Sequence, residues 1–320
     1  MIRNKMKGEF QFFNKRKDGT LEPLLDGAKS RNLIVDQFFE CLGSGVNGGN
    51  NSRLNFSAST SAGASSVSRW FIVGTGSTPP AATDTALENQ IASTDTVTDH
   101  SHSYSYDEQS DTLMFATVST RSFPIGGVVG NISEVGVDFS SSFAPWAGRF
   151  LQSRALIRDS QGDPTTISLG AEDQLVVVYT LTRVCNRSFS GTVNGFGYEG
   201  KLVGYTSPGG NIGVGTLNGS GAPTSVFRVT NQDWTFPAFN GNTFPNTTNV
   251  SVSTRSVQNT NTKHSRLRWR LPLATGNFAA GLKGIYSLVV NVQIKFTAPI
   301  MKTNEDILDI ELFTSFENMS

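Results

Sequence analysis

The stretch WFIVGTGSTPPAATDTALENQI, residues 70–91, holds the residues whose order comes closest to a nucleotide site. An apolar strand, a glycine turn and a helix N-terminus would present backbone amides to a pyrophosphate. A dinucleotide fingerprint needs a third glycine, but Gly74 and Gly76 are followed by Pro79 and Pro80, which have no amide proton. No GK[ST] sequence completes a phosphate loop elsewhere. We therefore expect a strand and a turn here, and no nucleotide.

Two short helices are predicted. The first lies over about 84–91, where Thr85 and Glu88 have capping-box spacing. The second lies in AKSRNLIVDQFFECLGSG, residues 28–45, whose apolar side chains share one helical face and which ends at glycines. That face is formed by Ile34, Phe38, Cys41 and Leu42.

Histidines and carboxylates offer few arrangements for chemistry. His100 and His102, in DHSHSY, share one face of a predicted strand and are candidate metal ligands, although an exposed polar strand edge is the favoured interpretation. The third histidine, His264, is distant in sequence. No GxSxG, SxxK or HExxH motif is present, and the acidic groups at 107–111 and 306–311 are typical of solvated strand and turn residues. We expect no enzyme, no cofactor and no bound metal.

Basic residues cluster in two places. In KHSRLRWRL, residues 263–271, the arginines alternate with apolar residues, so a strand would present Arg266, Arg268 and Arg270 on one face. Repulsion between them requires carboxylates, which the strand near 306–311 could supply in this chain or in a neighbouring copy; we favour pairs between subunits. The second group is a basic arm or a docked strand near the N-terminus, with the candidate interface residues Lys5, Lys7, Lys15, Arg16 and Lys17.

A group of aromatic residues in QDWTFPAFNGNTF is the main candidate for ligand binding. Exposed aromatic side chains in loops are typical of modules that bind glycans or proteins. The alternative is that they form a small core in a segment that otherwise has little to bury. The residues are Trp234, Phe236, Phe239 and Phe244.

The elements that would position these residues are mainly strands. Only 16% of the residues are charged and glycine is abundant, a composition that favours short strands joined by turns. Eight segments have strand patterns, around 68–73, 101–106, 113–120, 132–139, 153–158, 174–184, 284–296 and 306–316. We predict a mainly β fold: an antiparallel, sandwich-like core with one or two short helices and a β insertion rich in Gly, Asn and Thr. The predicted parts are a basic N-terminal arm (1–29), a core domain (30–186 with 273–320) and the insertion or second subdomain (187–272).

Composition also bears on partners and location. The 26 basic and 26 acidic residues balance, so no net charge attracts nucleic acid or a membrane. No signal peptide or membrane span is expected, and Cys41 and Cys185 are expected to be buried thiols.

The residues around the glycine turn carry a different resemblance. FIVGTGSTPPAATDTALENQI resembles a segment, vGtGxxxPxxxDtaLxxxI, found in virion structural proteins of tailed bacteriophages. NLIVDQFFECL (32–42), ISEVGVDF (132–139) and LQSRALIRDSQGDPTTISLGAEDQLVVVYTL (151–181) are similar to the helix, the Glu-Val-Gly strand and the paired strands of that group. The resemblance covers roughly residues 30–185 and, more loosely, the C-terminal hairpin.

This resemblance implies a non-enzymatic structural component of a phage particle, in the tail or the neck and collar. It would form a symmetric homo-oligomer and contact other virion proteins, after synthesis in the host bacterial cytoplasm. A capsid decoration protein, or a tail-fibre module that binds a host-surface glycan or protein receptor, are the alternatives. No nucleic acid or membrane is expected as a partner.

Overall fold

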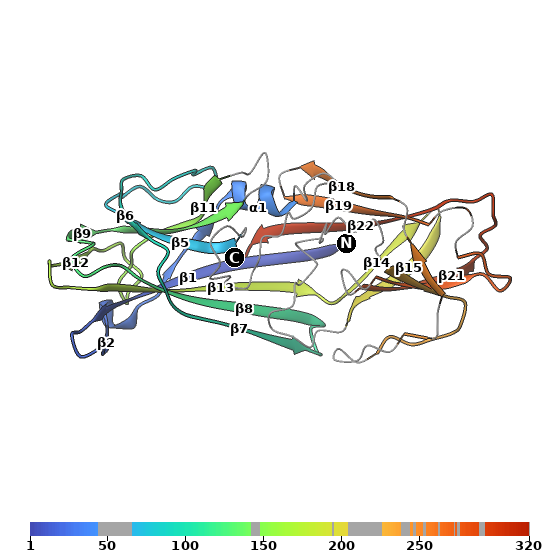
Figure 1. Cartoon of the computed structure of the whole chain (residues 1–320), viewed down its shortest axis with the longest axis horizontal. Coiled ribbons are helices and arrows are strands. Elements are labelled where there is room, and N and C mark those ends of the chain that lie inside the picture. Colours follow the sequence, from blue (N-terminus) through green and yellow to red (C-terminus); the bar gives the residue numbers. More distant parts are fainter. Residues whose placement is uncertain are drawn as a thin grey trace.

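The computed structural model describes residues 1–43, 66–141, 148–193, 195–203, 226–237, 244–245, 248–251, 254–261, 263–271, 273, 276–287 and 292–319. The chain is elongated and is built almost entirely of strands (Figure 1). The described part holds one α-helix, α1 (Asp36–Gly43), and a 3-10 turn, η1 (Leu25–Gly27). No helix within these ranges is long and apolar enough to span a bilayer.

The largest sheet has nine strands and runs along the molecule. Its main path is β18 (Thr254–Asn261), β19 (His264–Leu271), β22 (Leu308–Asn318), β1 (Ile2–Lys15), β13 (Leu175–Asn186), β8 (Thr112–Ser122) and β7 (Val97–Asp107). Two short strands, β2 (Leu21–Pro23) and β3 (Ser30–Arg31), also pair with β1.

Three further sheets complete the fold. The five-stranded sheet is β4 (Leu33–Ile34), β11 (Gly148–Leu156), β10 (Glu134–Ser141), β5 (Ser66–Gly74) and β6 (Gln90–Thr94). The six-stranded sheet is β14 (Ser188–Val193), β15 (Phe196–Leu202), β21 (Val292–Ile300), β20 (Leu282–Ser287), β16 (Val226–Thr230) and β17 (Thr248–Ser251). The smallest is β12 (Ile167–Leu169) with β9 (Gly130–Ile132). All pairings among the described strands are antiparallel except that of β1 with β22, so the predicted mainly antiparallel β fold is confirmed.

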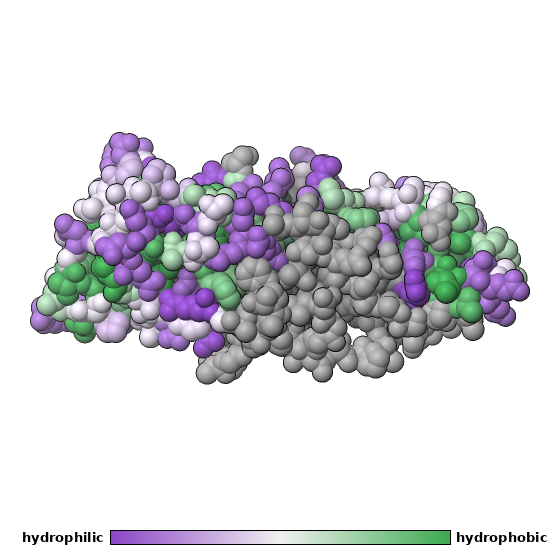
Figure 2. Space-filling model, turned by 90° about the horizontal axis from the view of Figure 1, so that it is seen from above, coloured by the Kyte–Doolittle hydropathy of each residue, from purple (hydrophilic) through white to green (hydrophobic). Residues whose placement is uncertain are grey.

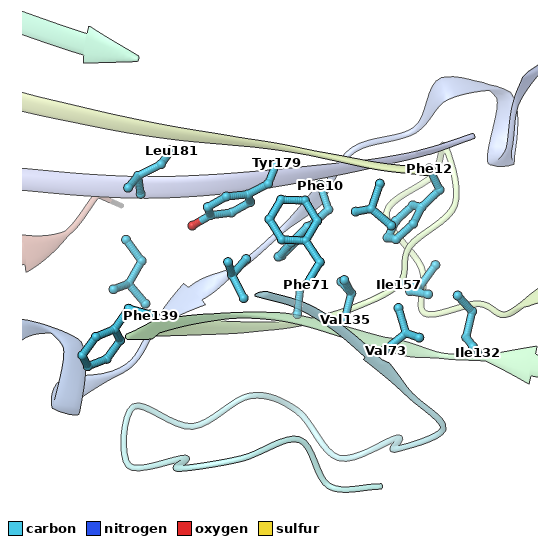
Figure 3. Close-up of a cluster of buried hydrophobic side chains, with 14 of the residues drawn as sticks. Phe10, Phe12, Phe71, Val73, Ile132, Val135, Phe139, Ile157, Tyr179 and Leu181 are labelled. Atoms are coloured by element: carbon cyan, nitrogen blue, oxygen red, sulfur yellow. The ribbon is translucent and has the colours of Figure 1, made fainter. Parts of the chain in front are cut away.

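One face of the nine-stranded sheet contributes to two hydrophobic cores. Towards one end of the molecule it packs against the five-stranded sheet: Phe10 and Tyr179, whose ring centroids are 4.7 Å apart, face Phe71 and Val135 (Figure 3). Towards the other end, further residues of the same sheet share a core with the six-stranded sheet, including Ile2, Leu113, Cys185, Ile285, Val292 and Ile294. The long sheet therefore joins two cores that lie one after the other along the molecule.

The Tyr179 hydroxyl is a polar group inside the first core. It accepts a hydrogen bond of 2.9 Å from Asn32 Nδ2 and lies 3.4 Å from Ser153 Oγ, while burial raises the tyrosine pKa to about 12. Gly8 makes room for these groups, because a Cβ at that position would lie 2.3 Å from the hydroxyl. The position accepts only glycine without a shift of the core.

The N-terminal segment differs from the separate basic arm predicted over 1–29. Residues 2–15 form β1, which pairs with β13 on one side and with β22, β3 and β2 along the other. Period-two alternation explains the difference: the odd positions carry the basic side chains, whereas Ile2, Met6 and Phe10 at even positions are buried. Of the two interpretations of this segment, a basic arm or a docked strand, the structure shows the docked strand.

Both predicted helices need correction. The helix over 84–91 is wrong: residues 81–89 form turns because side-chain carboxylates, including Asp84 bonded to the Ala81 amide at 2.9 Å, capture amides in and around the segment. The helix in 28–45 begins only at Asp36, because Leu33 and Ile34 pair with β11 as β4. Ile34 therefore belongs to a strand.

The insertion predicted over 187–272 does not correspond to one sheet. β18 and β19, inside that range, join the nine-stranded sheet through β22. β20 and β21, outside it, pair with β16 and β15 in the six-stranded sheet. The strand order therefore divides this part of the chain differently from the sequence boundaries.

Replacing Phe10 with alanine tests whether β1 is a core strand. We expect Phe10→Ala to lower the free energy of unfolding by about 3–5 kcal/mol, because it leaves a cavity between two sheets. Phe13→Ala, on the half-buried opposite face of the same strand, should cost less. Chemical denaturation measures both, and equal small losses would show that β1 does not stabilise the core.

Candidate functional site

The loop that resembles a nucleotide site, residues 75–89, joins β5 to β6 and lies on the outer face of the five-stranded sheet. Two charged residues of the sheet lie beneath it, Glu134 on β10 and Arg154 on β11. Arg154 pairs with Gly136, two positions from Glu134, so both charged side chains project from the same face. Both are buried, with 0% and 3% of their surfaces exposed.

Arg154 contacts three carboxylates. Its Nε donates to Glu134 at 2.8 Å, Nη1 to Asp84 at 2.9 Å, and Nη2 approaches Glu88 at 3.4 Å. Nη2 also donates to the Thr78 carbonyl at 3.1 Å. We call these four charged residues, Arg154, Glu134, Asp84 and Glu88, the Arg154 cluster. The cluster attaches the loop 75–89 to the five-stranded sheet.

The carboxylates of the cluster accept the loop's backbone amides. Glu134 Oε1 accepts from Gly76 at 3.0 Å and from Asn89 at 2.8 Å. Glu88 Oε2 accepts from the amides of Ser77 and Thr78 at 2.7 and 2.8 Å. Hydrogen bonds from Thr78, and then from Ser77, hold the pKa of Glu88 below its usual value. The amides that would face a phosphate in a nucleotide loop thus bind carboxylates of the protein itself.

The two glycines of the loop provide space for Glu134. A Cβ at Gly74 or at Gly76 would lie 2.5 Å from Glu134 Oε1. Their role here is close approach to a buried carboxylate, which explains a glycine turn without a ligand. The arrangement supports a structural role for the motif.

His100 and His102 lie on β7, with ring centroids 6.0 Å apart. His100 Nδ1 lies 3.0 Å from Ser119 Oγ. Burial lowers the pKa of His100 to about 4, with Arg121 and His102 adding to the shift. Within the described ranges, no group of three His, Cys, Asp or Glu residues could hold a metal ion. The role of His100 and His102 as metal ligands stays a prediction.

Arg270 meets a carboxylate of its own chain. Its guanidinium binds Asp309 of β22 through two hydrogen bonds of 2.8 Å. The backbone register also places Arg268 opposite Glu311, but the side chains of Arg266 and Arg268 lie outside the described part. The acidic strand proposed as a partner is thus found in this chain for Arg270. A role between subunits stays a prediction.

The basic residues near the N-terminus also have partners in the chain. Lys5 lies 3.6 Å from Glu317, Lys7 lies 3.7 Å from Glu9 and Lys17 lies 3.3 Å from Glu172. Arg16 pairs with Glu22, and Lys15 lies at the end of β1. Most of these pairs are exposed to solvent, so each contributes little to stability. Their role in an interface stays a prediction.

The aromatic residues proposed for ligand binding form a packed group around Trp234. Its ring lies 4.8 Å from that of Phe236 and 5.0 Å from that of Phe244, and only 8% of Trp234 is exposed. Lys295 Nζ donates to the Trp234 carbonyl at 2.8 Å. This packing fits the small-core alternative for these three residues. Phe239 lies outside the described residues.

Two residues of the acidic groups considered for catalysis accept hydrogen bonds from neighbouring residues. Asp111 accepts from the Tyr106 hydroxyl and the Ser188 amide at 2.8 and 2.9 Å, and Asp306 accepts from the Thr303 amide at 2.8 Å. The free thiols, Cys41 and Cys185, are half-buried and buried, and burial raises the pKa of each.

Arg154 was not among the site residues expected from the sequence. The sequence does hold a signal for it: an arginine directly before the apolar run ALI and a glutamate opening the strand EVGV are both costly inside a β core. A buried cation on one strand and a buried carboxylate on another predict a pair. What the sequence lacked was the register that sets them side by side.

We expect Arg154→Gln to lower the free energy of unfolding by about 3–5 kcal/mol, because it leaves the buried Glu134 carboxylate without its cation. Arg16→Gln removes the same type of side chain from an exposed pair with Glu22 and should cost at most about 1 kcal/mol. Urea denaturation at neutral pH compares the two. A similar small loss for both would show that the cluster does not hold the fold.

The loop should loosen in acid. The pKa of Glu88 is lowered from 4.5, so its hydrogen bonds stabilise the loop above that pH and are lost as the pH falls through the lower folded value. At neutral pH, Glu88→Gln should reduce hydrogen-exchange protection of the Ser77 and Thr78 amides. Asp18→Asn, which removes an exposed carboxylate bonded to the Thr20 amide, should leave the protection of the Ser77 and Thr78 amides unchanged. Unchanged protection in Glu88→Gln would contradict this account.

No protein-family model matches the sequence, and comparison with curated proteins and with solved structures finds no significant match.

Proposed function

We propose that the chain is a non-enzymatic structural component of a tailed phage particle, placed in the tail or the neck and collar. The observation that carries this proposal is the Arg154 cluster. The segments that resemble phage virion proteins, around 70–91, 132–139 and 151–181, contain all four residues of the cluster. These four residues bind one another and the backbone of the loop. Their contacts therefore stabilise the fold and are not directed at a substrate.

Exposed apolar residues support contacts with neighbouring proteins. Ile125 and Val129, just before β9, are 63% and 56% exposed. Met301 and Ile307, beyond β21 at the other end of the molecule, are 63% and 47% exposed. Figure 2 shows hydrophobic residues at the surface near both ends of the long axis. Apolar surface at the ends of an elongated body suits assembly with neighbouring proteins.

The end that carries Met301 is held by a buried lysine. Lys302 Nζ donates to the Leu273 carbonyl at 2.8 Å and to Asn277 Oδ1 at 3.0 Å, which ties two loops together. Lys302 is 5% exposed, and burial lowers its pKa. A fixed loop pair presents its apolar residues at a lower entropic cost than a mobile one.

Self-assembly is tested by the mass of the purified protein. Light scattering over a range of protein and salt concentrations should give one discrete oligomer. Met301→Asp should lower the mass by placing a charge in the contact, whereas Met114→Asp, exposed on β8 away from the ends, should not. A monomer at every concentration would contradict self-assembly.

A further inference from the structure

A cleft lies where the nine-stranded sheet passes into the six-stranded sheet. Its volume is about 550 Å³, within the range typical of small-molecule sites. β13 ends at Asn186 and β14 begins at Ser188, so one continuous stretch of chain forms one side of the cleft. Arg3 and Lys5 of β1 lie beside it on the same face of the nine-stranded sheet, because Lys5 pairs with Val184 in the register of β1 and β13.

The part of the cleft formed by β1 is positive. Arg3 and Lys5 are exposed and project on the same face of the strand. Lys5 Nζ lies 3.6 Å from Glu317 Oε1, in an ion pair that is half exposed to solvent. Arg3 forms no ion pair within the described ranges, so its guanidinium is open to an anion in the cleft.

The side formed by β13 and β14 is fixed by hydrogen bonds. Asn186 Oδ1 accepts from the Arg3 amide at 2.7 Å, and Asn186 Nδ2 donates to the Ser188 carbonyl at 2.6 Å, which joins β1, β13 and β14. Ser188 and Ser190 line this side, and Met1, Val184 and Phe189 add apolar area. Cations, serine residues and apolar area thus lie side by side along one opening.

We propose that this cleft binds a carboxylate-bearing saccharide, such as a uronic acid unit. The planar guanidinium of Arg3 matches a carboxylate through two parallel hydrogen bonds, and Lys5 adds a second cation. Sugar hydroxyls match the hydroxyls of Ser188 and Ser190 beside the two cations. An acidic peptide side chain would use Arg3 and leave these serines without partners. This binding is independent of assembly and goes beyond the proposed structural role.

The test is calorimetric titration of the full chain with a disaccharide of galacturonic acid, beside the neutral disaccharide of galactose. We expect binding of the acidic sugar that weakens as salt rises, and much weaker binding of the neutral one. Arg3→Gln should weaken binding at least about tenfold, because it removes a charge-assisted hydrogen bond. Lys17→Gln, which removes a cation from an exposed pair with Glu172, should keep the affinity.

Four results would overturn the proposal: absence of binding by the acidic disaccharide, equal binding of the neutral one, undiminished binding by Arg3→Gln, or equal affinity for inorganic phosphate or an acidic peptide. Arg3 is exposed, so a thermal melt should show that Arg3→Gln stays folded.

Discussion

The carboxylate of Glu134 is fully buried, and the local structure around it follows from that constraint. A buried charge is tolerated only with a cation and hydrogen-bond donors around it. Arg154 supplies the cation, and the amides of Gly76, Glu88 and Asn89 supply donors. The loop must therefore fold down onto the sheet, and its glycines must leave room. The loop resembles a nucleotide site in sequence. In the structure, its hydrogen bonds attach it to the five-stranded sheet.

The nine-stranded sheet imposes a second constraint, on the whole chain. Residues 2–6 of β1 pair in parallel with residues 314–318 of β22, and residues 4–14 of β1 pair with β13 on the other side. Such pairings join positions far apart in sequence, which makes folding slow. Because both hydrophobic cores rest on the same face of this sheet, neither core is complete until β1 and β22 are in place.

Much of this could be predicted from sequence. The alternation of ISEVGVDF and the apolar run QLVVVYTLTRV identified β10 and β13, because a pleated strand exposes alternate residues to different environments. The N-terminal strand was harder to predict, since the basic side chains at its odd positions concealed the apolar side chains at its even positions. The turn at 81–89 could not be predicted from local propensity, because the carboxylates of Asp84 and Glu134 capture backbone amides there. The pairing of Arg154 with Glu134 depends on strand register, which local patterns do not give.

A double-mutant cycle on Glu134 and Arg154 tests the central claim most directly. Glu134→Gln, Arg154→Met and the double variant would be compared by chemical denaturation. If the two charges hold the loop on the sheet as a unit, the double variant should lose less stability than the sum of the single losses, by about 1–3 kcal/mol. Losses that add within about 0.5 kcal/mol would show that the charges act separately, and would contradict the structural role assigned to the cluster.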